Sequence, residues 1–373
     1  MSGAPGTALS EDIVQDMAKW LLLDGVPLDE AVVFVRTLHP SVDGRQFTWR
    51  KGQPVEVAEV MYGDLVTGNY RDTPYAQVVS SREGSRLTGN PDATGGFTDA
   101  IYQALPFLNG ETHVAAWFTR HAQGFDDISV QVLEAVRQPV ARIAEIMALR
   151  RTAHNLLDTY LGRGTGGRVL SGAIHRGDGD DIRAVIWFCD LRNSTPLAEA
   201  LGRRRFLTLL NDYLECLGGA VIVNGGEILR FIGDAALAIF PIADEKTGGY
   251  SVQEACTRAV KAAHDAMQRM AALNVRYRES GREPVGFGIG LHVGEVMYGN
   301  IGASNRLEFT VIGAAANEAA RIEAQCKVHG VSLIVSDGVA KVVPHEWRSL
   351  GPHKLAGVGR ELELFTVAEP GTC

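Results

Sequence analysis

The sequence predicts an α+β fold with two globular domains joined by a helical segment. Short apolar runs with strand character occur in both halves of the chain, interleaved with segments of helical spacing. An apolar stripe at helical spacing fills 128–161 and separates the two halves. With 373 residues, 46% of them hydrophobic, the chain can fill two cores. We therefore expect domains at 1–127 and 181–369, with a linker at 128–180.

The N-terminal domain is predicted to open with a helix, because Ile13, Met17 and Leu21 recur at helical spacing after an acidic stretch. A further helix is predicted over 97–105. Several short segments have strand character and end at turns rich in Gly, Pro and Asp: 31–38, 46–50, 55–62, 77–80 and 114–119. Together these elements indicate a small α+β domain.

The order of these elements resembles that of a GAF-type sensory domain, which implies a small-molecule or protein input of unknown identity. The segment before residue 128 contains no cysteine, so it offers neither a Cys–His haem pair nor a chromophore cysteine. His39, His113 and His121 are far apart in the sequence, which favours packed or exposed side chains over a metal site. A ligand pocket and a purely structural or dimerising role both remain open.

The linker is predicted to be a long helix followed by a glycine-rich loop. Before Pro139 the apolar stripe is expected to pack on its own domain, and Pro139 is expected to kink or restart the helix. Charged residues flank the stripe beyond this point: Arg142, Glu145, Arg150 and Arg151. This pattern is compatible with a short two-chain coiled coil over 141–160. GRGTGG at 162–167 is expected to end the helix, and 177–181 to form an acidic loop.

Two aspartates follow apolar runs in the C-terminal half. The run at 184–189 is too short for a core helix and predicts a buried strand that ends on Asp190. The segment 227–240 predicts a hairpin with Asp234 at its tip. If these strands are neighbours, the two carboxylates raise each other's pKa unless a cation lies between them. Oxygen ligands of this kind favour Mg²⁺ or Mn²⁺.

The segments around these acids complete the predicted domain. Thr195 is expected to cap a helix whose first residue is Pro196. Other helices are predicted over 252–273 and from residue 314 onward, and other strands over 287–293, 297–300 and 309–312.

Taken singly, Asp190 can be read as a helix cap and Asp234 as a turn residue, with no chemistry at either. The motifs around them favour a functional reading. FCDLRNST, GGEILRFIGDAALAIFP and FTVIGAAANEAARIE follow one another in the last half of the chain. They closely resemble the class III nucleotidyl cyclases, the adenylate and guanylate cyclases. The resemblance implies a ferredoxin-like (palm-like) catalytic domain.

By this resemblance, Asp190 and Asp234 hold a pair of Mg²⁺ or Mn²⁺ ions, and the Leu191 carbonyl assists one of them. The start of the following helix receives the triphosphate on its free amides. The residues that would form this phosphate site are Asn193, Ser194 and Thr195.

The resemblance also assigns the transferring and base-reading groups. Asn317 and Arg321 match the family's Asn-x-x-x-Arg pair, in which Asn orients the ribose and Arg stabilises charge on the α-phosphate. Arg230 stands where adenylate cyclases usually have Lys, and Thr310 is its base-reading partner, as in one subgroup. The Glu and Cys that guanylate cyclases tend to use are missing here, so adenine is the expected base.

Two further positions depart from the family pattern. Asn193-Ser194 replaces the usual Gly-Phe after the first metal acid. Ala356 stands where a basic residue commonly grips the triphosphate. Lys354 lies two positions earlier, and on a strand that spacing keeps it on the same face as a partial replacement.

The resemblance implies conversion of ATP to 3′,5′-cyclic AMP and pyrophosphate, in a homodimer whose sites combine metal acids from one chain with groups of the other. The alternative is a nucleotide-binding regulatory module with little or no turnover. Retention of Asp190 and Asp234 favours the enzyme, whereas Asn193-Ser194 and Ala356 favour the module.

Composition limits the other function classes. A formal net charge of −8 argues against a nucleic-acid partner. The first residues lack the pattern of a signal peptide, and no apolar run is expected to span a bilayer. The five cysteines are scattered and odd in number, which fits a reducing cytoplasm better than a disulfide framework.

Overall fold

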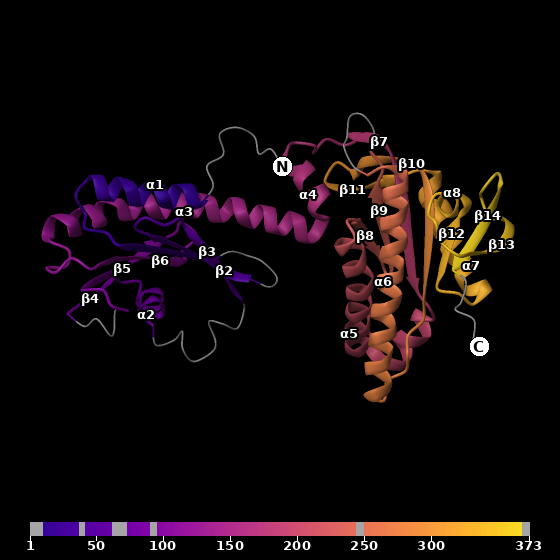
Figure 1. Cartoon of the computed structure of the whole chain (residues 1–373), viewed down its shortest axis with the longest axis horizontal. Helices are drawn as coiled ribbons and strands as arrows, with labels where there is room; N and C mark the ends of the chain where they lie inside the picture. Colours follow the sequence, from indigo (N-terminus) through magenta and orange to yellow (C-terminus); the bar gives the residue numbers. More distant parts are fainter. Residues whose placement is uncertain (1–9, 37–41, 62–72, 90–94, 244–249, 368–373) are drawn as a thin grey trace. The chain divides into compact units, whose positions relative to one another are not determined.

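A computed structural model describes residues 10–36, 42–61, 73–89, 95–243 and 250–367 of the chain (Figure 1). The chain divides into two compact units, Met1–Leu156 and Leu157–Cys373. His39 and Cys373 lie outside the described residues, as do the predicted ends of the strands at 31–38 and 55–62 and of the second domain. Each unit has its own sheet and its own hydrophobic core.

The N-terminal unit is an antiparallel sheet with helices on both faces. Its strands run in the order β3-β2-β1-β6-β5-β4. The elements are α1 (Ser10–Leu23), β1 (Glu30–Arg36), β2 (Val42–Arg50), β3 (Glu56–Met61), α2 (Pro74–Ser81), β4 (Ser85–Thr88), β5 (Asp99–Pro106), β6 (Thr112–Thr119) and α3 (Asp127–Leu161).

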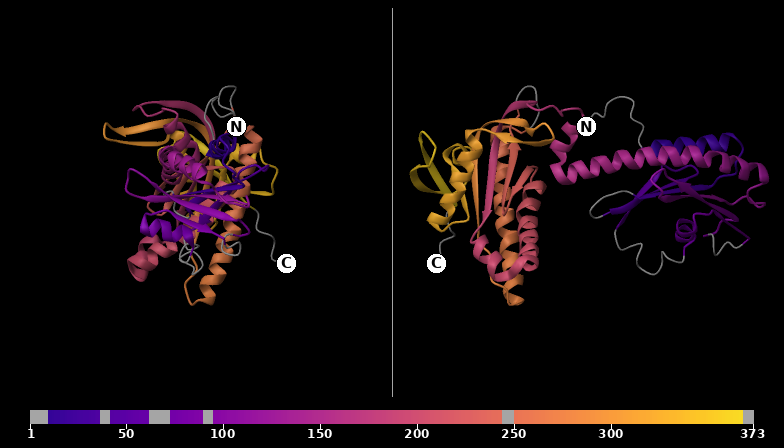
Figure 2. Two further views of the ribbon diagram at one scale, coloured as in Figure 1. Left: turned by 90° about the vertical axis from the view of Figure 1, so that its left-hand side faces the viewer. Right: turned by 180° about the vertical axis from the view of Figure 1, so that it is seen from behind.

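Alternation along the strands assigns these helices to their faces. On β1, Val33 and Val35 share a core with α1 and α3, whereas Val32 shares one with Val78 of α2. Figures 1 and 2 both show α1 running alongside α3 over the sheet.

Two sequence predictions in this unit are wrong. Residues 77–80 were expected to be a strand, but they lie in α2. Thr73 caps this helix, its hydroxyl accepts a hydrogen bond from the Ala76 amide at 3.3 Å, and Pro74 occupies the first turn. Residues 97–105 were expected to be a helix, but most of them form β5. Both faces of this strand are buried, one in the core with α1 and α3 and the other in the core with α2. Its sequence therefore lacks the alternation that marks a half-exposed strand.

Helix α3 runs unbroken through Pro139, so this proline does not restart the helix. As predicted, the part before Pro139 packs on its own unit through Leu133, and the packing continues through Val140. Arg142 and Glu145 make their polar contacts within this unit, and the two-chain coiled coil over 141–160 stays a prediction. The Glu145 carboxylate accepts from the Leu108 amide at 2.8 Å and from Arg142 at 2.6 Å, which fastens α3 to the β5–β6 turn.

The C-terminal unit has a sheet in the order β13-β14-β12-β10-β7-β9-β8, with β11 paired to β10. Its elements are α4 (Arg163–Leu170), β7 (Gly179–Leu191), α5 (Ser194–Val223), β8 (Glu227–Ile232), β9 (Ala235–Pro241), α6 (Val252–Glu279), β10 (Phe287–Ala303), β11 (Arg306–Ile312), α7 (Ala314–His329), β12 (Leu333–Ser336), α8 (Asp337–Ala340), β13 (Trp347–Lys354) and β14 (Glu361–Val367). The succession β7-α5-β8-β9-α6-β10, with sheet order β10-β7-β9-β8, is the ferredoxin-like arrangement.

Several segments differ from the sequence predictions in extent. Residues 287–293 and 297–300 belong to one continuous strand, β10. The long helix α3 ends at Leu161, directly before GRGTGG as predicted, but the motif does not form a loop, because α4 begins at Arg163. The helix after Asp190 begins at Ser194, so Thr195 is not its cap.

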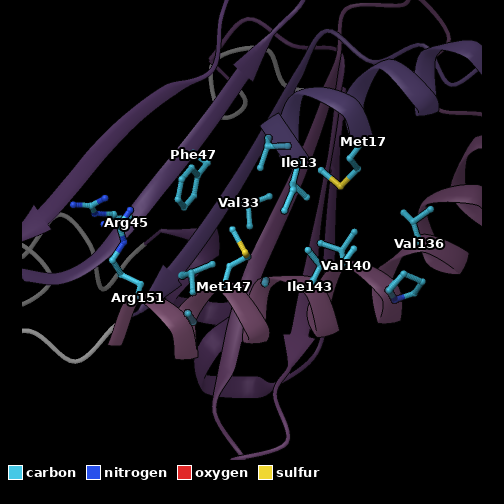
Figure 3. Close-up of a pocket in the computed structure, with 15 residues that line it drawn as sticks. Ile13, Met17, Val33, Arg45, Phe47, Val136, Val140, Ile143, Met147 and Arg151 are labelled. Atoms are coloured by element: carbon cyan, nitrogen blue, oxygen red, sulfur yellow. The ribbon is translucent and has the colours of Figure 1, made fainter. Parts of the chain in front are cut away.

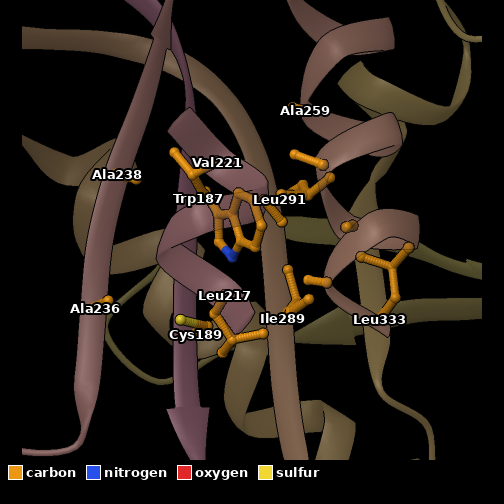
Figure 4. Packing of buried hydrophobic residues seen from close by; sticks show 14 of the residues in the cluster. Trp187, Cys189, Leu217, Val221, Ala236, Ala238, Ala259, Ile289, Leu291 and Leu333 are labelled. Atoms are coloured by element: carbon orange, nitrogen blue, oxygen red, sulfur yellow. The ribbon is translucent and has the colours of Figure 1, made fainter. Parts of the chain in front are cut away.

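The core of the C-terminal unit forms where α5 and α6 cover one sheet face. Trp187 of β7 is 1% exposed and packs with Leu217 and Val221 of α5 and Ala259 of α6 (Figure 4). The other face of β7, through Ala184 and Ile186, packs against α7. This two-sided burial explains the continuous apolar run that predicted the strand.

Two carboxylates link helix α4 to the sheet of this unit: Asp180 of β7 pairs with Arg168 at 2.8 Å, and Glu227 holds Thr165. Glu227, the first residue of β8, accepts hydrogen bonds from the Thr165 amide at 2.8 Å, the Thr165 hydroxyl at 3.1 Å and the Tyr298 hydroxyl at 2.9 Å. A Cβ on Gly164 would lie 2.4 Å from this carboxylate. Glycine at this position therefore permits the close approach.

Helix α5 is the one helix in the described ranges that is long and apolar enough to cross a membrane by length and composition. The expectation that no run reaches this length is therefore not met. The side chains of Tyr213, Leu217 and Val221 on this helix are buried in the core of the unit, which is the packing of a core helix.

Candidate active site

Strand pairing brings Asp190 and Asp234 together, as the sequence predicted for neighbouring strands. Cys189 of β7 pairs with Ala236 of β9, so Asp190 at the end of β7 lies beside the turn that carries Asp234. The Asp234 carboxylate is within hydrogen-bonding reach of Asp190. Burial, followed by the charge of Asp234, raises the pKa of Asp190 to about 6. Leu191, the last residue of β7, is buried next to them.

A third acid, which sequence reasoning missed, lies close to this pair. Glu323 of α7 is 8% exposed, and its carboxylate packs over Gly288, the β10 residue opposite Asp190. Burial raises the pKa of Glu323 to about 7, and the charges of Asp190 and Asp234 add to the effect. A Cβ at residue 288 would lie 2.1 Å from the Glu323 carboxylate. Two alternate glycines on this strand, Gly288 and Gly290, were the signal for this close helix.

Asn193 forms the turn between the first acid and helix α5. Its backbone has φ 56° and ψ 35°, the left-handed conformation, and it is the N-cap residue of α5. Asn tolerates this conformation better than most residues with a Cβ. Asn193 therefore preserves a backbone that glycine would otherwise provide. The amides of the first turn, at Ser194 and Thr195, have no acceptor within the helix and point toward its N-terminal end.

The two predicted base-reading residues lie on strands that share a side-chain contact. Arg230 of β8 forms an ion pair at 3.1 Å with Glu308 of β11, and Thr310 follows Glu308 on the same face. Thr310 is 2% exposed. In the described part of the chain, the Thr310 hydroxyl and the Arg230 Nε are buried without a hydrogen-bond partner. Such unsatisfied groups are costly, and a polar ligand would satisfy them.

Asn317 and Arg321 lie one turn apart on the exposed side of α7, opposite the face that buries Ala319 and Ile322. Across the residues that the structure describes, neither side chain has a hydrogen-bond or ion-pair partner. Within one chain, therefore, no polar contact in the described ranges connects Asn317 or Arg321 to Asp190 and Asp234. Both are accessible to groups from outside the chain.

A buried histidine anchors the start of α7. His292 of β10 lies 2.9 Å from Glu318 on one ring nitrogen and 2.9 Å from the Ser336 hydroxyl on the other. Burial lowers the pKa of His292, so the neutral ring is favoured. Ser336 is fully buried, which keeps this Ser–His–Glu set away from any substrate. Its effect is to position the helix next to Asn317.

Lys354 ends β13 with an exposed side chain, and Ala356 follows in a turn. The two residues therefore do not share a strand face, and the predicted equivalence by alternation does not hold. Sequence spacing alone could not reveal that the strand stops between them.

Comparison with known proteins agrees with this geometry. Residues 181–365 match the family model described as adenylate and guanylate cyclase catalytic domain. This part of the chain is a nucleotidyl cyclase catalytic domain. The class III nucleotidyl cyclase assignment applies to these residues, and the N-terminal unit lies outside the match.

Individual relatives are similar over the same half. A protein named adenylate cyclase from Anabaena cylindrica is 35% identical over 163 residues, which is 43% of this chain and 30% of that protein. Adenylate cyclase 1 from Rhizobium meliloti is 28% identical over 184 residues, 48% of this chain and 26% of that protein. The chain thus spans less than a third of the length of these curated relatives. The structure of a bacterial light-regulated adenylyl cyclase shares the fold, with a TM-score of 0.51 and 19% identity, over 71% of this chain and 85% of that one.

Proposed function

We propose that the chain is an adenylate cyclase that converts ATP to 3′,5′-cyclic AMP and pyrophosphate, regulated by a GAF-like N-terminal domain. The observation that carries the proposal is the convergence of Asp190 and Asp234 beside the N-terminus of α5. Two carboxylates held within hydrogen-bonding reach, one with a raised pKa, repel each other and gain from a cation between them.

The donor set fits Mg²⁺ or Mn²⁺. Asp190, Asp234 and the Leu191 carbonyl supply only oxygen atoms, which these cations prefer. When bound, such ions polarise the phosphate and favour ionisation of the attacking 3′-hydroxyl.

The other groups act on the nucleotide itself. In our proposal the first amides of α5, at Asn193, Ser194 and Thr195, bind phosphate oxygens. Thr310 and Arg230 satisfy their unpaired polar atoms on the edge of the adenine ring. Lys354 contributes charge toward the triphosphate.

Asn317 and Arg321 are proposed to complete the active site of a second copy of the chain. Their exposure and lack of intrachain polar partners support a site shared between two protomers. In a head-to-tail homodimer, Asn317 orients the ribose and the Arg321 fork stabilises the charge on the α-phosphate during transfer.

A cyclic-nucleotide assay tests the proposal directly. Purified full-length protein with Mn²⁺ and ATP should produce cyclic AMP, and Asp234→Asn should not. Asp181→Asn, an exposed acid at the far end of the same strand β7, is the matched control. Wild-type protein that is folded and dimeric but forms no cyclic nucleotide from ATP or GTP would refute the enzyme assignment.

The second candidate is a nucleotide-binding module with little or no turnover. The ion pair of Arg230 with Glu308 and the absence of a basic group at Ala356 favour it. A fluorescent ATP analogue distinguishes the two functions. Binding that depends on Asp190 and Asp234, without product, identifies the module.

A further inference from the structure

The N-terminal unit contains an apolar cavity of about 180 Å³ on the face of its sheet that α1 and α3 cover (Figure 3). Helix α1, strands β1 and β2, and helix α3 each contribute to its wall. The main apolar lining residues are Ile13, Met17, Val33, Phe47, Val140 and Met147. The cavity lies within this unit alone, and the residues of the cyclase site take no part in it.

Two arginines lie at one end of the cavity. Arg45 of β2 and Arg151 of α3 lie at this end, both drawn at the left of Figure 3. Arg45 shares its strand face with Phe47 and Trp49, which are core residues. A guanidinium thus occupies an inward position where the pattern of the strand requires an apolar side chain.

The two arginines are not equally compensated. Arg45 forms an ion pair with Glu59 of β3. Arg151 has no hydrogen bond or ion pair within the described ranges. Burial lowers the pKa of Arg151, and the like charge of Arg45 lowers it further, against the opposing charges of Glu11 and Glu59. An anion at this position would relieve the repulsion and supply the acceptor that Arg151 lacks.

We propose that this cavity binds an aliphatic carboxylate, with its unbranched apolar chain between α1, α3 and the sheet and its carboxylate on Arg151. The wall offers side chains for an alkyl chain, and its charged lining groups are the two arginines. A nucleotide would find no polar groups there to read a base or a ribose. A carboxylate matches the guanidinium fork in shape and charge.

Helix α3 makes this site relevant to the rest of the chain. The same helix that lines the cavity through Val140 and Met147 continues to Leu161, beyond the boundary of the N-terminal unit. The alkyl chain of a bound carboxylate, lying against α3 and α1, would stabilise the packing of these helices on the sheet. The carboxylate is therefore the chemical class of input that this unit is built to accept.

Calorimetric titration of the full-length protein with decanoate, without metal or nucleotide, tests the proposal. We expect one decanoate bound per chain, and decanol, of equal chain length, bound about tenfold or more weakly. Arg151→Gln should weaken decanoate binding by about tenfold to a hundredfold and leave decanol unchanged. Arg150→Gln, at the neighbouring arginine that does not line the cavity, should change neither.

A cavity-filling variant provides the second readout. Ala148 lines the cavity, and Ala148→Phe should abolish binding of both ligands while the melting temperature shows that the protein is folded.

Folded wild-type protein that binds no decanoate would overturn the proposal. So would equal affinity for decanoate and decanol with no effect of Arg151→Gln. If Met147→Glu converts a dimer to a monomer and decanoate does not bind, a second copy covers the cavity and the proposal is wrong. Because no turnover is measured, the outcome is independent of the cyclase assignment.

Discussion

The two sheets of this chain carry their functional charges in different places. In the catalytic unit, Asp190 ends a strand and Asp234 lies in a turn, so both carboxylates are at the edge of the sheet. In the N-terminal unit, Arg45 stands within a strand, on the face that packs against helices. An acid at a strand end can change without loss of core packing. A basic residue within a strand, such as Arg45, cannot be replaced without a change in the side chains packed around it. In our proposals the acids at the strand ends hold the cations, whereas Arg45 contributes its charge to the wall of a cavity.

The largest expected effect is on the rate of cyclic AMP formation, when one of the two acids at the strand ends is removed. Asp234→Asn should lower the rate of cyclic AMP formation by about a hundredfold or more, because one acceptor of the cation pair is lost. The melting temperature should stay within a few degrees of wild type, since Asp234 lies in a turn. The measurement is kcat with Mn²⁺ and ATP, beside a thermal melt. A variant with wild-type kcat would show that the acids at the sheet edge are not catalytic.

The base preference tests whether the strand pair β8–β11 reads the nucleotide. Arg230→Lys with Thr310→Asp should sharpen the ratio of kcat/KM for ATP over GTP by about tenfold to a hundredfold. The guanidinium fork and a hydroxyl that can donate or accept discriminate less well than Lys with Asp. Glu308→Gln, which frees Arg230 from its ion pair, should shift the ratio by a few-fold. Arg306→Lys, exposed on the same strand, is the control. An unchanged ratio in the double variant would remove the residue-level support for adenine.

A mixing experiment sharpens the comparison by asking which groups come from a second chain. Asp190→Ala and Arg321→Ala, each inactive alone, should recover up to about a quarter of wild-type activity when mixed. Random pairing gives mixed dimers half of the time, and each mixed dimer has one intact site of two. Subunit exchange must be shown independently by a labelled protomer. Exchange without recovered activity would mean that Arg321 acts in its own chain.

The smallest expected effect concerns stability. The pKa of Asp190 is raised to about 6, so its ionised form costs stability above that pH. Asp190→Asn should raise the melting temperature by about 2–4 °C at pH 8 without metal, once solvent screening of this half-exposed group is allowed for. The gain should shrink as the pH falls from 6 toward 4, where wild-type Asp190 is protonated. Mn²⁺ should stabilise only the wild type, so that the wild type then has the higher melting temperature of the two. A gain that is independent of pH would exclude ionisation as its cause.

How much could be predicted from the sequence follows the same contrast. The acids at the strand ends were predictable because a buried run followed by Asp, and a hairpin with Asp at its tip, are local patterns. Their meeting required only that β7 and β9 be neighbours. Glu323 was not predictable in this way, because its position depends on how α7 packs over Gly288 and Gly290. Glu308 was missed for the same reason, since only the pairing of strands brings it to Arg230.

The N-terminal unit was harder to predict because local preference and tertiary burial disagree there. Gln77 to Ser80 includes two valines and suggested a strand, yet Thr73 and Pro74 begin a helix before them. The buried strand β5 carries Ala, Gln and Leu, which favour helices when taken alone. The cavity and the inward position of Arg45 become visible only once the register of β2 against β1 and β3 is known.

The attachment of α4 to the catalytic sheet has a mechanical consequence. One oxygen of Glu227 receives all three hydrogen bonds from Thr165 and Tyr298. A shift of α4 by a single residue breaks the two bonds from Thr165 together, and no neighbouring carboxylate is available on β8 to replace them. The two bonds from Thr165 therefore depend on one register of α4 against β8, and the ion pair of Arg168 with Asp180 of β7 is a second link from the same helix. Glu227 begins the strand whose opposite end leads into the turn with Asp234, so the attachment of α4 and this acid lie at opposite ends of one six-residue strand.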